Sequence, residues 1–229
     1  MRISAIGSAL VLSILPLVQG GAQTEGRSPR FGLTGGMNIA KLSGDNIGTG
    51  AKNHTGLMLG GLVLIPVAHN LAFQPEVLFV TKGADFAEGT VSGGMKLQYV
   101  EVPVVLRLDI PASGGVKPFA YVGPAFSVRT SCAFEGRVQG ASASINCDDV
   151  FGQVGEPGAL TFRTTDVGGL VGGGFAFDVG GRVVTIGARY ELGFINVMAA
   201  GTATPSTNID SKNRVLSILG TFEWPFHSK

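Results

Sequence analysis

The two cysteines, Cys132 and Cys147, have the clearest chemical consequence in this sequence. They close a segment of about 16 residues, and the Cys-x-x-Cys spacing of redox motifs is absent. An exported chain, which the amino terminus indicates below, meets an oxidising compartment. We therefore expect a disulfide that staples a long loop and contributes roughly 3 kcal/mol in the chain-entropy model. The functional alternative is a stiffened surface hairpin that presents a binding surface.

The three histidines, His54, His69 and His227, share no metal-ligand spacing with one another or with the cysteines. Three acids gather near the cysteines: Asp148, Asp149 and Glu156. Their spacing matches no calcium-loop pattern, so we expect a solvated acidic loop. The sequence therefore predicts no metal and no other cofactor.

Charged residues recur at alternate positions of apolar segments. They are Glu76, Glu101, Arg107, Arg189, Glu191 and Glu223. Paired carboxylates such as Glu76 and Glu101 can do acid–base work. The interior of an eight-stranded barrel, however, is just wide enough for its own side chains. We expect a packed interior polar network that includes Arg107 and Arg189, and no catalytic residue.

The composition indicates an exported membrane protein. Charged residues make up 14% of the 229 residues, against about 25% in soluble domains. The net charge of +1, without a run of lysine or arginine, argues against a nucleic-acid partner. Residues 1–22 read as a signal peptide cleaved after Ala22, with an uncleaved anchor as the alternative. Residues 23–229 form one domain without an apolar run of roughly 18 residues, the length that a spanning helix needs.

Period-2 alternation of apolar and polar residues predicts eight strands. Their ranges are 31–40, 55–66, 71–82, 97–110, 117–130, 166–179, 183–197 and 213–226. In the well-patterned strands, charges lie on the face opposite the aliphatic and aromatic residues. This arrangement suits a wall with lipid outside and a polar interior.

The connections between these strands alternate strictly between short and long, as in outer-membrane barrels. We therefore expect an all-β, eight-stranded antiparallel up-and-down transmembrane barrel in the bacterial outer membrane, with short periplasmic turns and long extracellular loops. Phe222, Trp224 and Phe226 would form an aromatic belt near the periplasmic side. Pro75, Pro103 and Pro124 lie inside strands, where we expect bulges or breaks in the hydrogen-bond ladder.

Three segments resemble the PorT-like outer-membrane β-barrel family. They are Phe31–Ile39 (FGLTGGMNI), Tyr99–Leu106 (YVEVPVVL) and Lys117–Pro124 (KPFAYVGP). Ala188-Arg189-Tyr190, followed by Gly193, resembles the family's seventh strand, and the Glu-x-Pro strand is the most specific match. The resemblance implies an outer-membrane barrel without catalytic residues. Some members of the family serve protein secretion.

The sequence favours a monomeric, non-enzymatic barrel with a structural or interaction role through its long extracellular loops. Its expected partners are outer-membrane lipid, the barrel-assembly machinery and an unidentified extracellular or periplasmic protein. Four alternatives remain: a secretion-associated barrel, a small open pore, a soluble lipocalin-like ligand-binding barrel, and a rim-located membrane enzyme. In the enzyme, His54 would meet Asp45 or another loop acid, although no Gly-x-Ser-x-Gly motif supports it.

Overall fold

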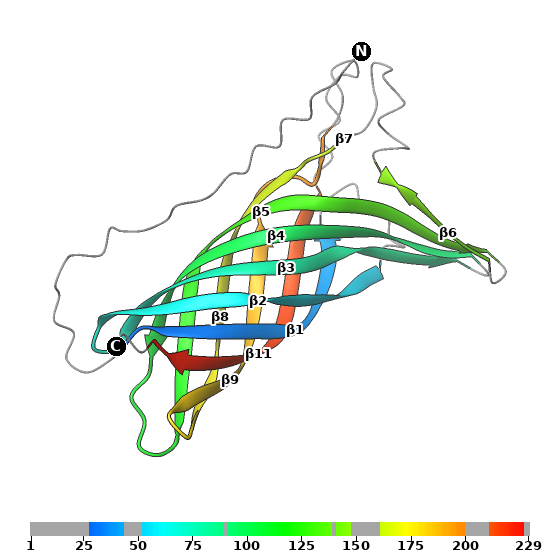
Figure 1. Cartoon of the computed structure of the whole chain (residues 1–229). Coiled ribbons are helices and arrows are strands. Elements are labelled where there is room, and N and C mark those ends of the chain that lie inside the picture. The colour runs from blue at the N-terminus through cyan, green and yellow to red at the C-terminus, as the bar shows by residue number, and fades with distance from the viewer. Residues whose placement is uncertain are drawn as a thin grey trace, which may run out of the picture.

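The computed structural model describes residues 28–43, 52–88, 91–138, 141–147, 161–199 and 211–226. Eight long strands form the wall of a barrel (Figure 1): β1 (Arg30–Ser43), β2 (Lys52–Ala68), β3 (Leu71–Glu88), β4 (Val91–Asp109), β5 (Val116–Val138), β8 (Thr165–Val179), β9 (Arg182–Gly193) and β11 (Lys212–Pro225). Three short strands are added: β6 (Ala141–Asn146), β7 (Thr161–Phe162) and β10 (Met198–Ala199). No helix in the described ranges is long and apolar enough to cross a membrane. The expected signal peptide, residues 1–22, lies outside these ranges.

The wall closes on itself through antiparallel pairs. The sheet runs β4-β3-β2-β1-β11-β9-β8-β5, and a further pairing of β4 with β5 joins its two ends. Closure removes the free edges that an open sheet would expose. Outside the wall, β6 pairs with the outer part of β5, and β7 pairs with β10. The predicted eight-stranded up-and-down barrel is confirmed.

Three short turns, at residues 69–70, 110–115 and 180–181, lie at one end of the barrel. The paired residues Arg30 and Pro225, where the first strand begins and the last one ends, lie at the same end. Gly180 and Gly181 have φ angles of 58° and 79°, which a two-residue hairpin turn of the I′ type requires. Short turns are periplasmic in outer-membrane barrels, so the expected topology makes the opposite end extracellular.

Each wall strand turns mainly apolar side chains outward and a mixture of polar, small and packed apolar side chains inward, because successive side chains of a strand point to opposite faces. In β9, for example, Thr185 and Arg189 are buried, whereas Ile186 and Tyr190 are exposed on the outer face. The same alternation orients β2, whose sequence left both faces apolar: Leu57 and Leu59 point outward, and Met58 points inward. The outside of the barrel is therefore a continuous apolar surface.

The three strand prolines interrupt the ladder without shifting its register. The recorded pairs skip Pro75 on the side of β2, Pro103 on the side of β3 and Pro124 on the side of β4, and pairing resumes in the same register. Each proline is fully paired with the strand on its other side. Proline lacks a donor on one side only, which explains this pattern. The expected ladder breaks are present, whereas the register shifts of the structure lie elsewhere.

Several predicted strand ends are wrong at the extracellular end. Residues 83–96, expected as a loop, continue β3 and β4 and leave only residues 89–90 between them. Likewise β5 continues to Val138, and β6 folds back against it. Glycines and charged residues in these segments indicated loops, but cross-strand pairing overrides such weak local preferences. In the opposite direction, β9 ends at Gly193 instead of Val197. We call residues 83–88, 91–96, 131–138 and 141–147 the extracellular platform.

Candidate functional site: a charged lumen beneath a disulfide-bonded platform

The lumen at the periplasmic end contains a layer of ion pairs around Arg107. Its guanidinium donates to Asp109 and to Glu223, each at 2.9 Å, and lies 4.0 Å from the centre of the Phe119 ring. Arg30 lies 3.0 Å from the other oxygen of Glu223. This layer joins β1, β4 and β11 across the lumen.

A second layer, further into the barrel, is built on Arg189. Its Nη2 contacts both carboxylate oxygens of Glu76, at 2.9 and 2.7 Å, and its Nε donates to the Tyr121 hydroxyl at 3.3 Å. Gln74 donates to Glu76 at 2.7 Å. The Tyr121 ring lies over Gly172, where an added Cβ would come within 2.5 Å of the ring. The glycine therefore provides the space that this aromatic ring occupies.

The third layer, nearest the extracellular end, is centred on Lys82. The Lys82 side chain is 0% exposed, and Nζ donates to Glu101 at 2.7 Å and to Glu191 at 2.6 Å. Ser127 donates to the Glu101 oxygen that Lys82 also contacts, at 3.1 Å. Lys82 and Glu191 lie on separate strands that do not pair, so the ammonium group bridges the lumen. Two carboxylates here depend on one cation.

All six residues of the predicted interior network are buried in the lumen, but they do not form one cluster. Glu76 pairs with Arg189 and Arg107 pairs with Glu223, whereas Glu101 pairs with Lys82. The sequence reasoning omitted Lys82. Its parity in β3 matches that of Gln74 and Glu76, so the alternation that placed those residues inside could have placed Lys82 there too.

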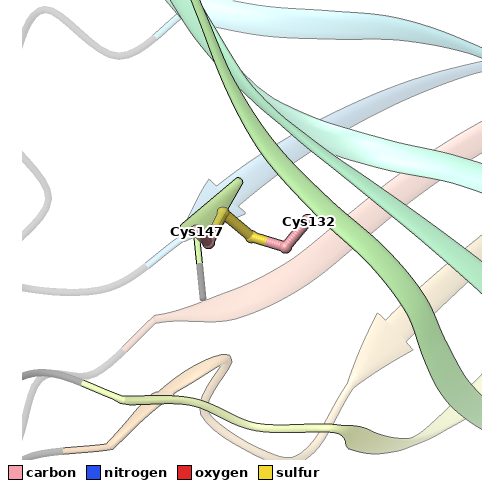
Figure 2. Close-up of a disulfide and its surroundings, with 2 residues drawn as sticks. All are labelled: Cys132 and Cys147. Carbon is pink, nitrogen blue, oxygen red and sulfur yellow. A yellow bond between two sulfur atoms is a disulfide. The ribbon is translucent and has the colours of Figure 1, made fainter. Parts of the chain in front are cut away.

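An apolar cluster lies on the side of β4 and β5, where the extracellular platform begins. Cys132 and Cys147 lie opposite one another on β5 and just after β6, with Cα atoms 5.3 Å apart, and form the predicted disulfide (Figure 2). The disulfide packs in a buried apolar cluster with Met95, Leu97, Tyr99 and Val197. The cluster is supplied by β4, β5 and the segments after β6 and β9. It gives the platform a small core of its own above the charged layers.

We expect the double substitution Cys132→Ala and Cys147→Ala to loosen the platform and leave the barrel folded. The chain-entropy model assigns the bridge roughly 3 kcal/mol, and that contribution acts on a segment outside the wall. Limited proteolysis of the variant in micelles should cleave within 133–147 at lower protease concentration than in the parent. The heat-modifiable shift of the folded barrel on a gel should remain. Loss of that shift would mean that the bridge supports the wall itself.

The histidines and loop acids lie in less specific surroundings. His54 lies at the extracellular rim, and its Nδ1 is hydrogen-bonded to Asp85 Oδ1 at 2.9 Å. The sequence predicted Asp85 to lie in a loop. His69 is exposed in a periplasmic turn. His227, Asp45 and the acids Asp148, Asp149 and Glu156 lie outside the described residues. Within the described ranges, no three His, Cys, Asp or Glu side chains are grouped so that they could hold a metal ion.

A family model for the outer membrane protein beta-barrel domain matches residues 21–199. The chain belongs to this outer-membrane β-barrel family. The match places the protein in the bacterial outer membrane. In such barrels the apolar outer face contacts lipid. The soluble lipocalin-like alternative is therefore wrong. The family model is broader than the PorT-like group that the sequence resembles.

This chain is similar to several solved structures of small outer-membrane barrels. OprG from Pseudomonas aeruginosa is 13% identical, with a TM-score of 0.46 over 88% of this chain and 97% of its own. AlkL in lipid bilayers is 13% identical, with a TM-score of 0.45 over 91% of this chain and 97% of its own. The attachment invasion locus protein Ail of Yersinia pestis is 12% identical, with a TM-score of 0.41 over 86% of this chain and 100% of its own. No curated protein sequence matches.

Four aromatic residues of the outer-membrane barrel gather near its periplasmic end. Phe222 and Trp224 of β11 have ring centres 5.9 Å apart, and Phe31 and Phe226 have ring centres 5.1 Å apart. Phe31 pairs with Trp224 across the β1–β11 ladder, so the four rings adjoin. Aromatic rings prefer the border between lipid and water. That these residues form an interfacial belt stays a prediction.

Proposed function

We propose that this outer-membrane barrel has a non-enzymatic interaction role, exercised through the extracellular platform. The observation that supports the proposal is the construction of the platform. Paired strands continue beyond the other wall strands, and a disulfide and a buried apolar cluster hold them together (Figure 1). Loops that only connect strands do not need a buried core to hold them in one conformation. A pre-ordered surface loses less conformational entropy when a partner binds.

The strand β6 is the part of the platform best suited to contact a partner. Among the described residues it pairs only with β5, so its other edge offers free backbone donors and acceptors. The strand contains neither a charge nor a proline, the features that usually protect an exposed edge. Ser144 and Ile145 are exposed. An extended segment of another protein can add to such an edge as a further strand.

Two alternatives are weaker on this geometry. A secretion-associated role, as the PorT-like resemblance implies for some barrels, would use the periplasmic rim, where short turns such as residues 110–115 offer little built surface. A rim enzyme would use His54, which Asp85 orients. Among the described residues, however, no serine, threonine or cysteine hydrogen-bonds to the His54 ring, so the ring has no nucleophile to activate.

Site-specific photocrosslinking on intact cells tests the proposal. A benzophenone side chain at Ser144 of β6 should yield a discrete protein adduct, because this position faces outward from the platform edge. The same side chain at Leu59, on the lipid-facing wall, is the matched control and should yield none. The Cys132→Ala and Cys147→Ala variant should lose the adduct at Ser144. Adducts obtained only from Ser113, in a periplasmic turn, would contradict the proposal and favour the secretion alternative.

A further inference from the structure

Two cations lie directly opposite one another on the outer face of the barrel, at its extracellular end. Lys41 of β1 pairs with Arg214 of β11 in the antiparallel register. Their positions continue the outward-facing series of each strand, because Ile39 and Leu216, the preceding pair on this face, are each 46% exposed to the outside.

No acidic side chain neutralises this pair within the described part of the chain. Neither Lys41 nor Arg214 forms a salt bridge there. By contrast, the lumen cations Lys82, Arg107 and Arg189 all contact carboxylates. Like charges directly opposite on neighbouring strands destabilise a sheet. The pair therefore creates a place where an anion from outside the chain would be stabilised.

An apolar groove lies below the two cations on the same face. Gly35 and Gly220 are paired across β1 and β11, and neither has a side chain to cover the wall. The resulting groove has a volume of about 570 Å³. Its other outward-facing walls include Met37, Ile39, Leu216 and Ile218. The groove extends as far as Ile39 and Leu216, and the Lys41–Arg214 pair is the next outward-facing pair of the same two strands.

We propose that this face binds one acylated lipid of the outer leaflet whose phosphate gives it a net negative charge. The lipid's acyl chain occupies the groove over Gly35 and Gly220. Its phosphate lies between Lys41 and Arg214, where an arginine can give two parallel, charge-assisted hydrogen bonds. The position suits this occupant because the cations lie where the apolar wall ends on the extracellular side, at the depth of lipid head groups. The inference is independent of the platform and of the partner proposed for it.

Native mass spectrometry of the full barrel in neutral detergent, titrated with monophosphoryl lipid A, tests this site. The parent should retain one lipid. The double variant Lys41→Gln and Arg214→Gln should bind it about tenfold more weakly, a difference of about 1.4 kcal/mol. Gly220→Val should also weaken binding, because it fills the groove. The fold tolerates this change, since the nearest atom to the new Cβ, the Thr185 carbonyl oxygen, is 3.8 Å away. Arg182 is an exposed cation at the periplasmic end. The variant Arg182→Gln is therefore the matched control and should bind lipid A like the parent.

Thermal unfolding in the same detergent separates the binding site from a purely structural pair. Without lipid, the Lys41→Gln and Arg214→Gln variant should unfold at a temperature equal to or above that of the parent, because the repulsion between the two cations is gone. With lipid A, only the parent and Arg182→Gln should gain several degrees. Three results would overturn the proposal. They are retention of phosphatidylcholine equal to that of lipid A, equal protection by inorganic phosphate alone, and an unchanged lipid A affinity in both the Lys41→Gln and Arg214→Gln variant and the Gly220→Val variant.

Discussion

Lys82→Met should lower the free energy of unfolding by about 3–5 kcal/mol, the cost of removing one partner from a buried ion pair. The reason is the number of acids that depend on this lysine. Its Nζ contacts Glu101 and Glu191 at 2.7 and 2.6 Å in a fully buried layer. Methionine fills a similar volume but leaves both carboxylates without a cation. Urea unfolding of the barrel in lipid vesicles measures the loss.

Removing the acids as well should restore most of the stability of this layer. In the triple variant Lys82→Met, Glu101→Gln and Glu191→Gln no uncompensated charge remains, so it should be closer to the parent than Lys82→Met is. Lys117→Met is the control, because Lys117 pairs with Asp178 at the solvent-exposed rim. Its effect should lie within about 0–1 kcal/mol. A loss of this small size for Lys82→Met would mean that the layer is open to water and does not fill the lumen.

Val122→Arg should prevent stable insertion or lower stability by about 2–4 kcal/mol, the cost of an arginine on the lipid face near the bilayer midplane. Val122 is 59% exposed on the outer face of β5. It pairs with Leu106 on one side and Val171 on the other. Its neighbour on β5, Tyr121, points into the lumen and belongs to the second charged layer, which is built on Arg189. Val122 therefore lies near mid-height in the wall.

Recovery of Val122→Arg in the outer-membrane fraction, together with its gel shift on heating, measures insertion. Ser144→Arg, the same new side chain on the exposed platform, should insert normally. Glu101→Gln should be milder than Val122→Arg, because Lys82 keeps Glu191 as a partner. If Val122→Arg and Ser144→Arg insert equally well, the outer face of the wall does not contact lipid.

The barrel itself could be predicted from the sequence because two simple patterns determine it. Alternation in segments such as residues 97–110 and 183–197 assigned residues to the outer or inner face. The short turns, above all Gly180-Gly181, assigned the periplasmic end. The six charged interior residues followed from parity, and Lys82, the last residue of its predicted strand, was omitted although it shares that parity.

What the sequence could not provide was pairing between distant segments. Lys82 meets Glu191 only because the wall curves around the lumen. The platform combines residues that look like loop residues, such as Gly93 and Gly94, into regular strands because β4 lies between β3 and β5. The Lys41–Arg214 pair depends on the register of the closing strands β1 and β11. Registers of this kind depend on the three-dimensional fold and not on local sequence preference.

Oxygen accessibility along β9 tests the central claim, a wall with lipid outside and a charged lumen inside. A nitroxide would be placed singly at each residue from 183 to 192 in the barrel reconstituted in lipid vesicles. The structure predicts high collision rates with oxygen at Val184, Ile186, Ala188 and Tyr190, which point outward, and low rates at the positions between them, including Thr185 and Arg189. The opposite phase, or no period of two residues, would contradict the account.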